Sequence, residues 1–119
     1  MPITSIGSKF FSESKALTNT SDTDIYVVPN NFSSHVEHFL ISNNDTSTRN
    51  YTLKWYHADD ATTHTILNNH SLSGATFESV FTIDKPLFLH AGDKLIVAAG
   101  TANTLTVVVA AEEFYDPNR

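Results

Sequence analysis

The sequence predicts an all-β protein, an antiparallel β-sandwich of jelly-roll or immunoglobulin-like topology. Apolar and polar residues alternate with a period of two through most of the chain, which is typical of strands with one buried face. Turn-forming residues recur about every ten positions, a spacing expected of sandwiches and closed barrels. No window has the periodicity of a long helix, and threonine and valine, which favour strands, are frequent.

The first half of the chain is expected to contain three strands separated by polar turns. The first strand stops at Pro29 to Asn31. The second stops at Asn43 to Asp45, where short polar side chains can bond their own backbone. The third strand holds an aromatic cluster and runs into a hairpin loop at residues 58–61. These strands are predicted at residues 24–28, 36–42 and 51–57.

The second half continues the alternation in shorter pieces. A return strand completes the hairpin, and Asn68 to Gly74 forms the next turn. Asp84 to Pro86 ends the strand that follows, and Gly100 to Asn103 separates the last two strands. These strands are predicted at residues 63–67, 77–83, 87–89, 94–99 and 104–111.

The chain is divided into an N-terminal arm, residues 1–20, and a β-sandwich domain, residues 21–119. Both ends carry apolar residues outside the strong strand pattern, and each fully buried one gains roughly 1.5–3 kcal/mol. We therefore expect the ends to dock on the chain's own sheet or on a neighbour. The arm is expected to order against an adjacent subunit or a shell and to be dispensable for folding. The residues concerned are Ile3, Phe10, Phe11, Phe114 and Tyr115.

Composition excludes several classes of function. The 119 residues suffice for one domain with its own core. Without cysteine the chain has neither a disulfide framework nor thiolate chemistry, which fits folding in a reducing compartment. A net charge of -6 opposes binding to nucleic acid and to anionic membrane surfaces. The N-terminus lacks the features of a signal peptide, and no segment has the apolar length of a membrane span.

The six histidines do not have the spacing of a metal site. His35 and His38 lie three positions apart, which sends them to opposite faces of a strand unless a bulge intervenes. His57 and His64 flank the predicted hairpin loop, and with the loop carboxylates they would be the first ligands to examine. We predict no metal and no cofactor. The residues of this loop set are His57, Asp59, Asp60 and His64.

Catalytic chemistry is not predicted either. No nucleophile elbow and no glycine-rich phosphate loop is present. The carboxylates come as adjacent pairs, Asp59 with Asp60 and Glu112 with Glu113, and adjacent strand residues point apart. The chain is therefore expected not to be an enzyme, and no catalytic residue is assigned.

The aromatic cluster is interpreted mainly as structure. Trp55 shares its strand face with Leu53 and Tyr51, which favours burial, whereas Tyr56 shares its face with lysine and threonine, which favours exposure. A sugar-stacking site at Tyr56 is kept as an alternative. The predicted core consists of Phe39, Ile41, Leu53, Trp55, Phe81, Ile83, Leu95, Val97, Leu105 and Val107.

An ordered set of short motifs resembles small β-sandwich virion structural proteins of tailed bacteriophages, notably of marine and cyanobacterial phages. The resemblance covers roughly residues 24–113 and rests on the order of the motifs rather than on any one of them. In the Ala-Gly-Asp piece, glycine can take a positive backbone angle and aspartate can bond turn amides, so this motif is structural. The matching residues are Val28-Pro29, Ile41-Ser42-Asn43, Leu53-Lys54-Trp55-Tyr56, Leu89, Ala91-Gly92-Asp93-Lys94-Leu95, Val97, Ala102-Asn103 and Leu105.

The resemblance implies a non-enzymatic virion protein, made in the host cytoplasm. The preferred role is a capsid decoration protein that acts as a homo-oligomer, with a trimer favoured, and binds the major capsid protein. A neck or tail accessory protein and a carbohydrate-binding adhesion module with its site at Tyr56 and the Asp59-Asp60 loop are the alternatives. No nucleic acid or membrane partner is expected. The predicted interaction residues are Ile3, Phe10, Phe11, Tyr56, Phe114 and Tyr115.

Overall fold

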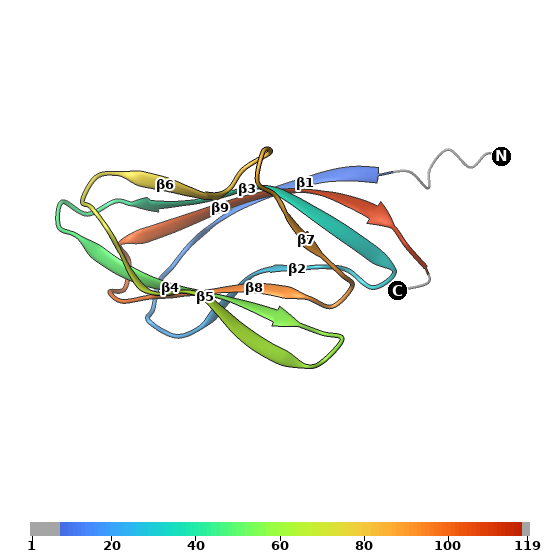
Figure 1. The fold of residues 1–119 in the computed structure, drawn as a ribbon. Coiled ribbons are helices and arrows are strands. Elements are labelled where there is room, and N and C mark those ends of the chain that lie inside the picture. The colour runs from blue at the N-terminus through green and yellow to red at the C-terminus, as the bar shows by residue number, and fades with distance from the viewer. Residues whose placement is uncertain (1–7, 118–119) are drawn as a thin grey trace.

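The computed structural model describes residues 8–117, which form two antiparallel β-sheets packed face to face (Figure 1). Within these residues, no helix is present that is long and apolar enough to cross a membrane. The strands are β1 (Ser8–Ala16), β2 (Thr23–Val27), β3 (Phe32–Asn43), β4 (Arg49–His57), β5 (Thr62–Leu72), β6 (Phe77–Phe81), β7 (Leu87–Leu89), β8 (Lys94–Ala99) and β9 (Leu105–Tyr115).

The strand order identifies the sandwich as a jelly roll. Sheet A has the order β1-β9-β3-β6, and β7 also pairs with β3, while sheet B has the order β2-β8-β4-β5. The chain crosses from one sheet to the other between most consecutive strands, and only β4–β5 and β6–β7 are successive strands of one sheet (Figure 1). This double-sheet arrangement is the jelly-roll pattern, so the immunoglobulin-like alternative is set aside.

The N-terminal segment departs from the sequence prediction. Residues 8–16 form β1, an edge strand of sheet A that pairs with β9 over its whole length. Leu17 follows it into the core and is 1% exposed, with its backbone bonded to Leu105 and Asn103. The predicted boundary of a separate arm at residue 20 is therefore corrected, because a full ladder of backbone hydrogen bonds ties this segment to the sandwich. Ile3 lies outside the described residues.

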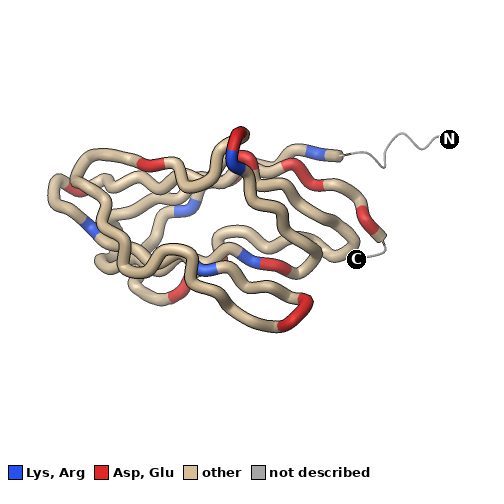
Figure 2. The backbone as a smooth tube through the Cα atoms, in the orientation of Figure 1, with Lys and Arg blue, Asp and Glu red and all other residues tan. Residues whose placement is uncertain are grey.

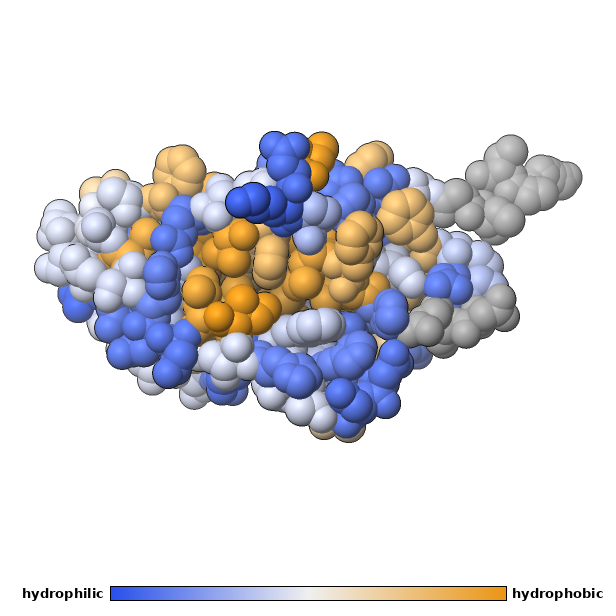
Figure 3. All heavy atoms as spheres, viewed as in Figure 1, coloured by the Kyte–Doolittle hydropathy of each residue, from blue (hydrophilic) through white to orange (hydrophobic). Residues whose placement is uncertain are grey.

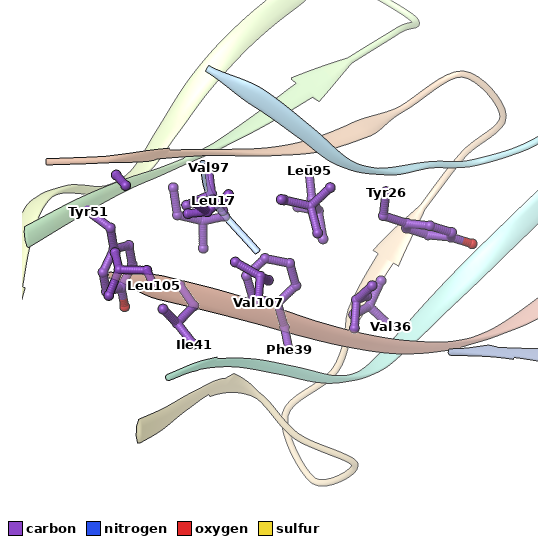
Figure 4. Close-up of a cluster of buried hydrophobic side chains, with 14 of the residues drawn as sticks. Leu17, Tyr26, Val36, Phe39, Ile41, Tyr51, Leu95, Val97, Leu105 and Val107 are labelled. Atoms are coloured by element: carbon purple, nitrogen blue, oxygen red, sulfur yellow. The ribbon is translucent and has the colours of Figure 1, made fainter. Parts of the chain in front are cut away.

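The core lies between the two sheets, where side chains of β3 and β9 meet those of β2, β4 and β8 (Figure 4). Tyr51, which the sequence placed beside Trp55, is also fully buried. Alternation explains this core, because every second residue of a strand faces the opposite sheet. The predicted core residues that the structure buries are Phe39, Ile41, Leu53, Leu95, Val97, Leu105 and Val107.

Three predicted core residues differ from this pattern. Trp55 and Phe81 are partly buried and pack against the core from its margin. Ile83 is 62% exposed, so its assignment to the core is wrong. The strand predicted to reach residue 83 ends at Phe81, and a tight turn bridged by Thr82 and Lys85 carries Ile83 away from the sandwich.

One flank of the sandwich leaves hydrophobic residues visible between the sheets (Figure 3). This flank lies between β5, the edge of sheet B, and β6 with β7, the edge of sheet A. The partly buried residues that these strands contribute are Leu67, Val80, Phe81 and Leu87. They close the core only in part, which is why they retain some exposure.

Candidate interaction surface

The outer face of sheet A, the side turned away from sheet B, is built from every second residue of its strands. The register places one row straight across the sheet: Phe10 of β1 lies opposite Glu112 of β9, which lies opposite His35 of β3, which lies opposite Phe88 of β7. Further along, Val108 and Leu40 lie opposite one another. Serine and alanine fill most positions between, which keeps the face flat. These small residues are Ser8, Ser12, Ser14, Ala16, Ser33, Ser42, Ser79 and Ala110.

Large apolar side chains are exposed on this face. Phe10 is 77% exposed and Phe88 is 66% exposed. Such a concentration on one flat sheet face is characteristic of contact surfaces, whose centres are enriched in aromatic residues and depleted in charge. Among the described residues, the face contains no lysine or arginine, and its only carboxylates are Glu37 and Glu112. The other exposed apolar residues on it are Phe77, Val108 and Phe114.

The outer face of sheet B is more highly charged, although Val27 is exposed on it. Lys54 lies 3.1 Å from Asp22, and Lys94 lies 3.4 Å from Asp24, so charged residues of both signs pair across it. The ammonium group of Lys94 also lies 5.6 Å from the centre of the Tyr56 ring. Figure 2 shows further charges at loops, including the acidic tip of the β4–β5 hairpin. Paired charges of this kind are typical of a solvated face.

A bulge in β3 alters the positions of His35 and His38. The pairing of β3 with β9 shifts between Val36 and His38, so that Glu37 is the extra residue. His35 and His38 consequently lie opposite Glu112 and Ala110, which both belong to the outer face of sheet A. The sequence placed the two histidines on opposite faces unless a bulge intervenes, and the bulge in β3 puts both on the same face.

A buried carboxylate organises the end of the sandwich at the β4–β5 hairpin. Asp93 is fully buried and accepts hydrogen bonds from the backbone N–H groups of Ala58 (2.9 Å) and His90 (3.1 Å) and from the indole of Trp55 (3.3 Å). His57 Nδ1 lies 3.4 Å from the same carboxylate. The Ala-Gly-Asp motif therefore joins two loops as well as making its own turn, in which Gly92 has a φ of 86°.

The residues of the predicted loop set are only partly brought together. The Asp59 carboxylate lies 3.9 Å from His57 Nε2 and 3.3 Å from His90 Nδ1. The ring of His64 lies beside that of Trp55, with centres 5.9 Å apart, and Asp60 accepts a hydrogen bond from the Thr62 backbone. The histidine that joins His57 and Asp59 is thus His90.

A second buried carboxylate lies at the flank between β1 and β2. Glu113 is 3% exposed and accepts a hydrogen bond from the Tyr26 hydroxyl at 2.5 Å, and Lys9 lies 3.7 Å from it. Burial, and then the bond to Glu113, raise the pKa of Tyr26 well above its ordinary value. An open cavity of about 520 Å³ adjoins this pair, lined by acidic, basic and apolar residues.

The predicted interaction residues fall into four environments. Phe10 and Phe114 lie on the outer face of sheet A. Phe11 instead turns toward sheet B and stacks on Tyr26 with ring centres 5.2 Å apart, which is the alternative of docking within the chain's own sandwich. Tyr115 is 45% exposed and packs edge-on against Phe32, and Tyr56 lies on the charged face of sheet B.

Sequence reasoning missed Phe77, Phe88 and Val108 as surface residues. Phe88 and Val108 sit in apolar runs that also supply buried neighbours, such as Leu87 and Leu89 around Phe88. Phe77 lies between Thr76 and Glu78. The period-two pattern marks them as facing opposite to the core, and this signal was available for Phe88 and Val108. What it could not show is that strands distant in the sequence bring them onto one face.

No known protein-family model matches the chain, and no curated protein matches it in sequence. Among solved structures, a protein of Bacillus endospore appendages, described as a novel family of disulfide-linked pili, is 11% identical. The match covers 92% of this chain and 86% of that chain with a TM-score of 0.52. A pentameric capsid protein from metagenomic phage sequences is 22% identical over 98% of this chain and 66% of that chain (TM-score 0.41).

The structure of infectious bursal disease virus, Gx strain, contains a chain that is 14% identical to this one. The match covers 98% of this chain and 33% of that chain, with a TM-score of 0.46. Of the three likenesses, that to the appendage protein has a TM-score above 0.5. At these identities, what the comparison establishes is the fold: this chain is an all-β, two-sheet antiparallel sandwich.

Proposed function

We propose that this chain is a non-enzymatic structural protein of a virion, which assembles as a homo-oligomer through the outer face of sheet A. The observation that carries the proposal is the contrast between the two outer faces. One displays five exposed apolar residues and almost no charge, whereas the other carries paired lysines and aspartates. A monomer gains nothing from the exposed apolar residues of the first face, and burying them against a neighbour removes apolar area from water.

The partner on this face is a second copy of the chain. The protein carries a net charge of -6, so two copies repel each other at a distance. On the outer face of sheet A only Glu37 and Glu112 carry negative charge among the described residues. Two copies that meet through this face therefore bring few like charges together. If the two copies meet about a two-fold axis, the same patch lies on both sides of the contact and the product is a dimer, in place of the trimer that the sequence resemblance favoured.

The place in the virion is the finer part of the proposal. Jelly rolls occur in viral capsids, lectins and cupins, and the sequence motifs resemble those of phage virion proteins. We assign the chain to capsid decoration, where an oligomer binds the major capsid protein by many weak contacts at once. A neck or tail position differs mainly in copy number, since such assemblies close as rings of about six to twelve subunits.

Two measurements test this proposal. Quantitative mass spectrometry of purified particles should find hundreds of copies for decoration, and a small ring number would place the protein at the neck or tail. Sedimentation of the isolated chain should show an oligomer that Phe10→Ser and Phe88→Ser dissociate without changing the circular dichroism spectrum. Tyr56→Ser, on the outer face of sheet B, is the matched control and should leave the oligomer intact.

Some outcomes would overturn the proposal. A chain that stays monomeric at all concentrations removes the homo-oligomer, and absence from purified particles removes the virion role. Glycan binding that is abolished by Tyr56→Ala but not by Phe88→Ser would establish the adhesion module in its place.

A further inference from the structure

Three side chains with metal-binding atoms converge on the outer face of sheet A. His35, Glu37 and Glu112 each offer one ligand atom, and these atoms all lie within 4.8 Å of one another. The register partners His35 and Glu112 come from adjacent strands, and the bulge in β3 brings in Glu37. His35 Nδ1 lies 3.8 Å from Glu37 Oε2. Each of the three side chains is partly buried, so the donors are set into the sheet rather than extended into solvent.

The charges of this cluster are not balanced by basic residues. In the described part of the chain, no lysine or arginine forms an ion pair with Glu37 or Glu112. The nearest basic residue along β1, Lys9, pairs with Glu113 on the opposite side of the sheet. Glu112 is held by a hydrogen bond from the Ser8 hydroxyl at 2.6 Å. Two neighbouring carboxylates without a countercharge attract a cation.

The imidazole of His35 adds an observation that is independent of the carboxylates. Its ring stacks on Phe88 with centres 4.6 Å apart and planes 16° apart, which fixes its orientation. Its Nε2 atom is inaccessible to solvent and has no hydrogen-bond partner among the described residues. The ring nitrogen that lies beside Glu37 is the other one, Nδ1, and its distance of 3.8 Å from Glu37 Oε2 is beyond that of a hydrogen bond. A cation bound beside the carboxylate would supply the partner that this nitrogen lacks there.

We propose that His35, Glu37 and Glu112 bind a divalent first-row metal ion, with Zn²⁺ as the best-suited one. One imidazole and two carboxylates form a mixed nitrogen and oxygen donor set of the kind that zinc accepts. Three protein ligands leave a further coordination position open toward solvent, which water or a group of a docked molecule can fill. The stacked Phe88 and the Ser8 hydroxyl orient the imidazole and one carboxylate, as outer groups do in metal sites.

The site stands on its own geometry and does not depend on the virion role, so it is tested on the isolated full chain. Calorimetric titration with Zn²⁺ alone should show one ion bound per chain. His35→Ala and Glu112→Gln should each weaken the affinity at least about ten-fold. Because these residues lie on an outer face, circular dichroism should show that both variants remain folded. Titration with Co²⁺ gives a second readout, since its visible absorption reports coordination by protein groups.

Two control variants separate this site from other histidines. His38→Ala changes an exposed histidine of the same strand and face and should leave Zn²⁺ binding unchanged. The double variant His57→Ala/His90→Ala tests the cluster at the β4–β5 hairpin and should also leave it unchanged. The inference is overturned if the chain shows no saturable binding of one ion, or if binding survives in His35→Ala and Glu112→Gln.

Discussion

The indole N–H of Trp55 donates a hydrogen bond to the Oδ2 atom of Asp93, with a nitrogen–oxygen distance of 3.3 Å. This contact explains why Trp55 lies at the margin of the core. Its ring packs against the buried cluster, while its polar atom reaches the carboxylate that also binds the Ala58 and His90 backbones. Large aromatic residues with a polar atom are commonly placed in this way.

Replacing Asp93 with alanine should destabilise the protein by roughly 2–4 kcal/mol. The change leaves the N–H groups of Trp55, Ala58 and His90 without their acceptor, and each unpaired, partly buried donor carries a cost. Asp93→Asn keeps the volume and one acceptor oxygen, so it should lose less. Urea unfolding measures both variants. Asp84→Ala, in the exposed loop after β6, is the control and should change stability by less than about 0.5 kcal/mol.

Trp55→Ala should cost about 3 kcal/mol, the lower end for a large aromatic residue, because the side chain is only partly buried. Trp55→Phe retains most of the apolar contact and removes the bond to Asp93, so it should cost about 1 kcal/mol. The comparison by urea unfolding separates packing from hydrogen bonding. If the two variants lose equal stability, the packing of the indole against the core contributes nothing measurable, and the hydrogen bond to Asp93 is the contribution of Trp55.

The sandwich could be predicted because its central strands alternate cleanly, as residues 94–99 do in β8, where every second residue is buried. The edge strand β1 could not be predicted in this way. Its inward positions hold Lys9, Glu13 and Lys15, so the alternation contains few apolar residues. Charged residues on the inward side of an edge strand discourage pairing with other chains. The same inward charges remove the hydrophobic periodicity by which a strand is recognised in a sequence.

The candidate surface and the cluster at His35 were predictable only in part. The exposed aromatic residues near the chain ends drew attention to Phe10 and Phe114, but their neighbours depend on pairing between strands far apart in the sequence. The bulge at Glu37 adds one residue to β3 and reverses the faces downstream of it. Glutamate at this position does not indicate a bulge, so the sequence alone could not show that His35, Glu37 and Glu112 lie together.

Truncations at the N-terminus test whether stability requires β1 or only the residues before it. A chain that begins at residue 8 should melt within about 2 °C of the parent, because β1 and its ladder remain. A chain that begins at residue 18 should show no cooperative melting. It loses the nine residue pairs between β1 and β9 and the buried Leu17, and it leaves β9 as an open edge prone to aggregation. Cooperative melting of the shorter chain at the parent temperature would show that β1 is dispensable.

The two buried phenols should make stability fall at alkaline pH. Burial first, and then a hydrogen bond to Glu113 or Glu78, raise the pKa of Tyr26 and of Tyr51 well above the ordinary value of 10.0. Above pH 10 the unfolded chain loses these protons and the folded chain keeps them, so the folded state binds more protons. The free energy of unfolding must then decrease as pH rises.

Below pH 10 the stabilising effect of the two protonated phenols is fully present. Above it, each phenol should remove up to about 1.4 kcal/mol of stability per pH unit. Urea unfolding at several values between pH 8 and pH 11 measures this slope in the parent, in Tyr26→Phe and in Tyr51→Phe. Each variant lowers stability at every pH, because it leaves a carboxylate without its donor, but it should show a shallower decline above pH 10. If both variants decline as steeply as the parent, neither phenol is held protonated by the fold.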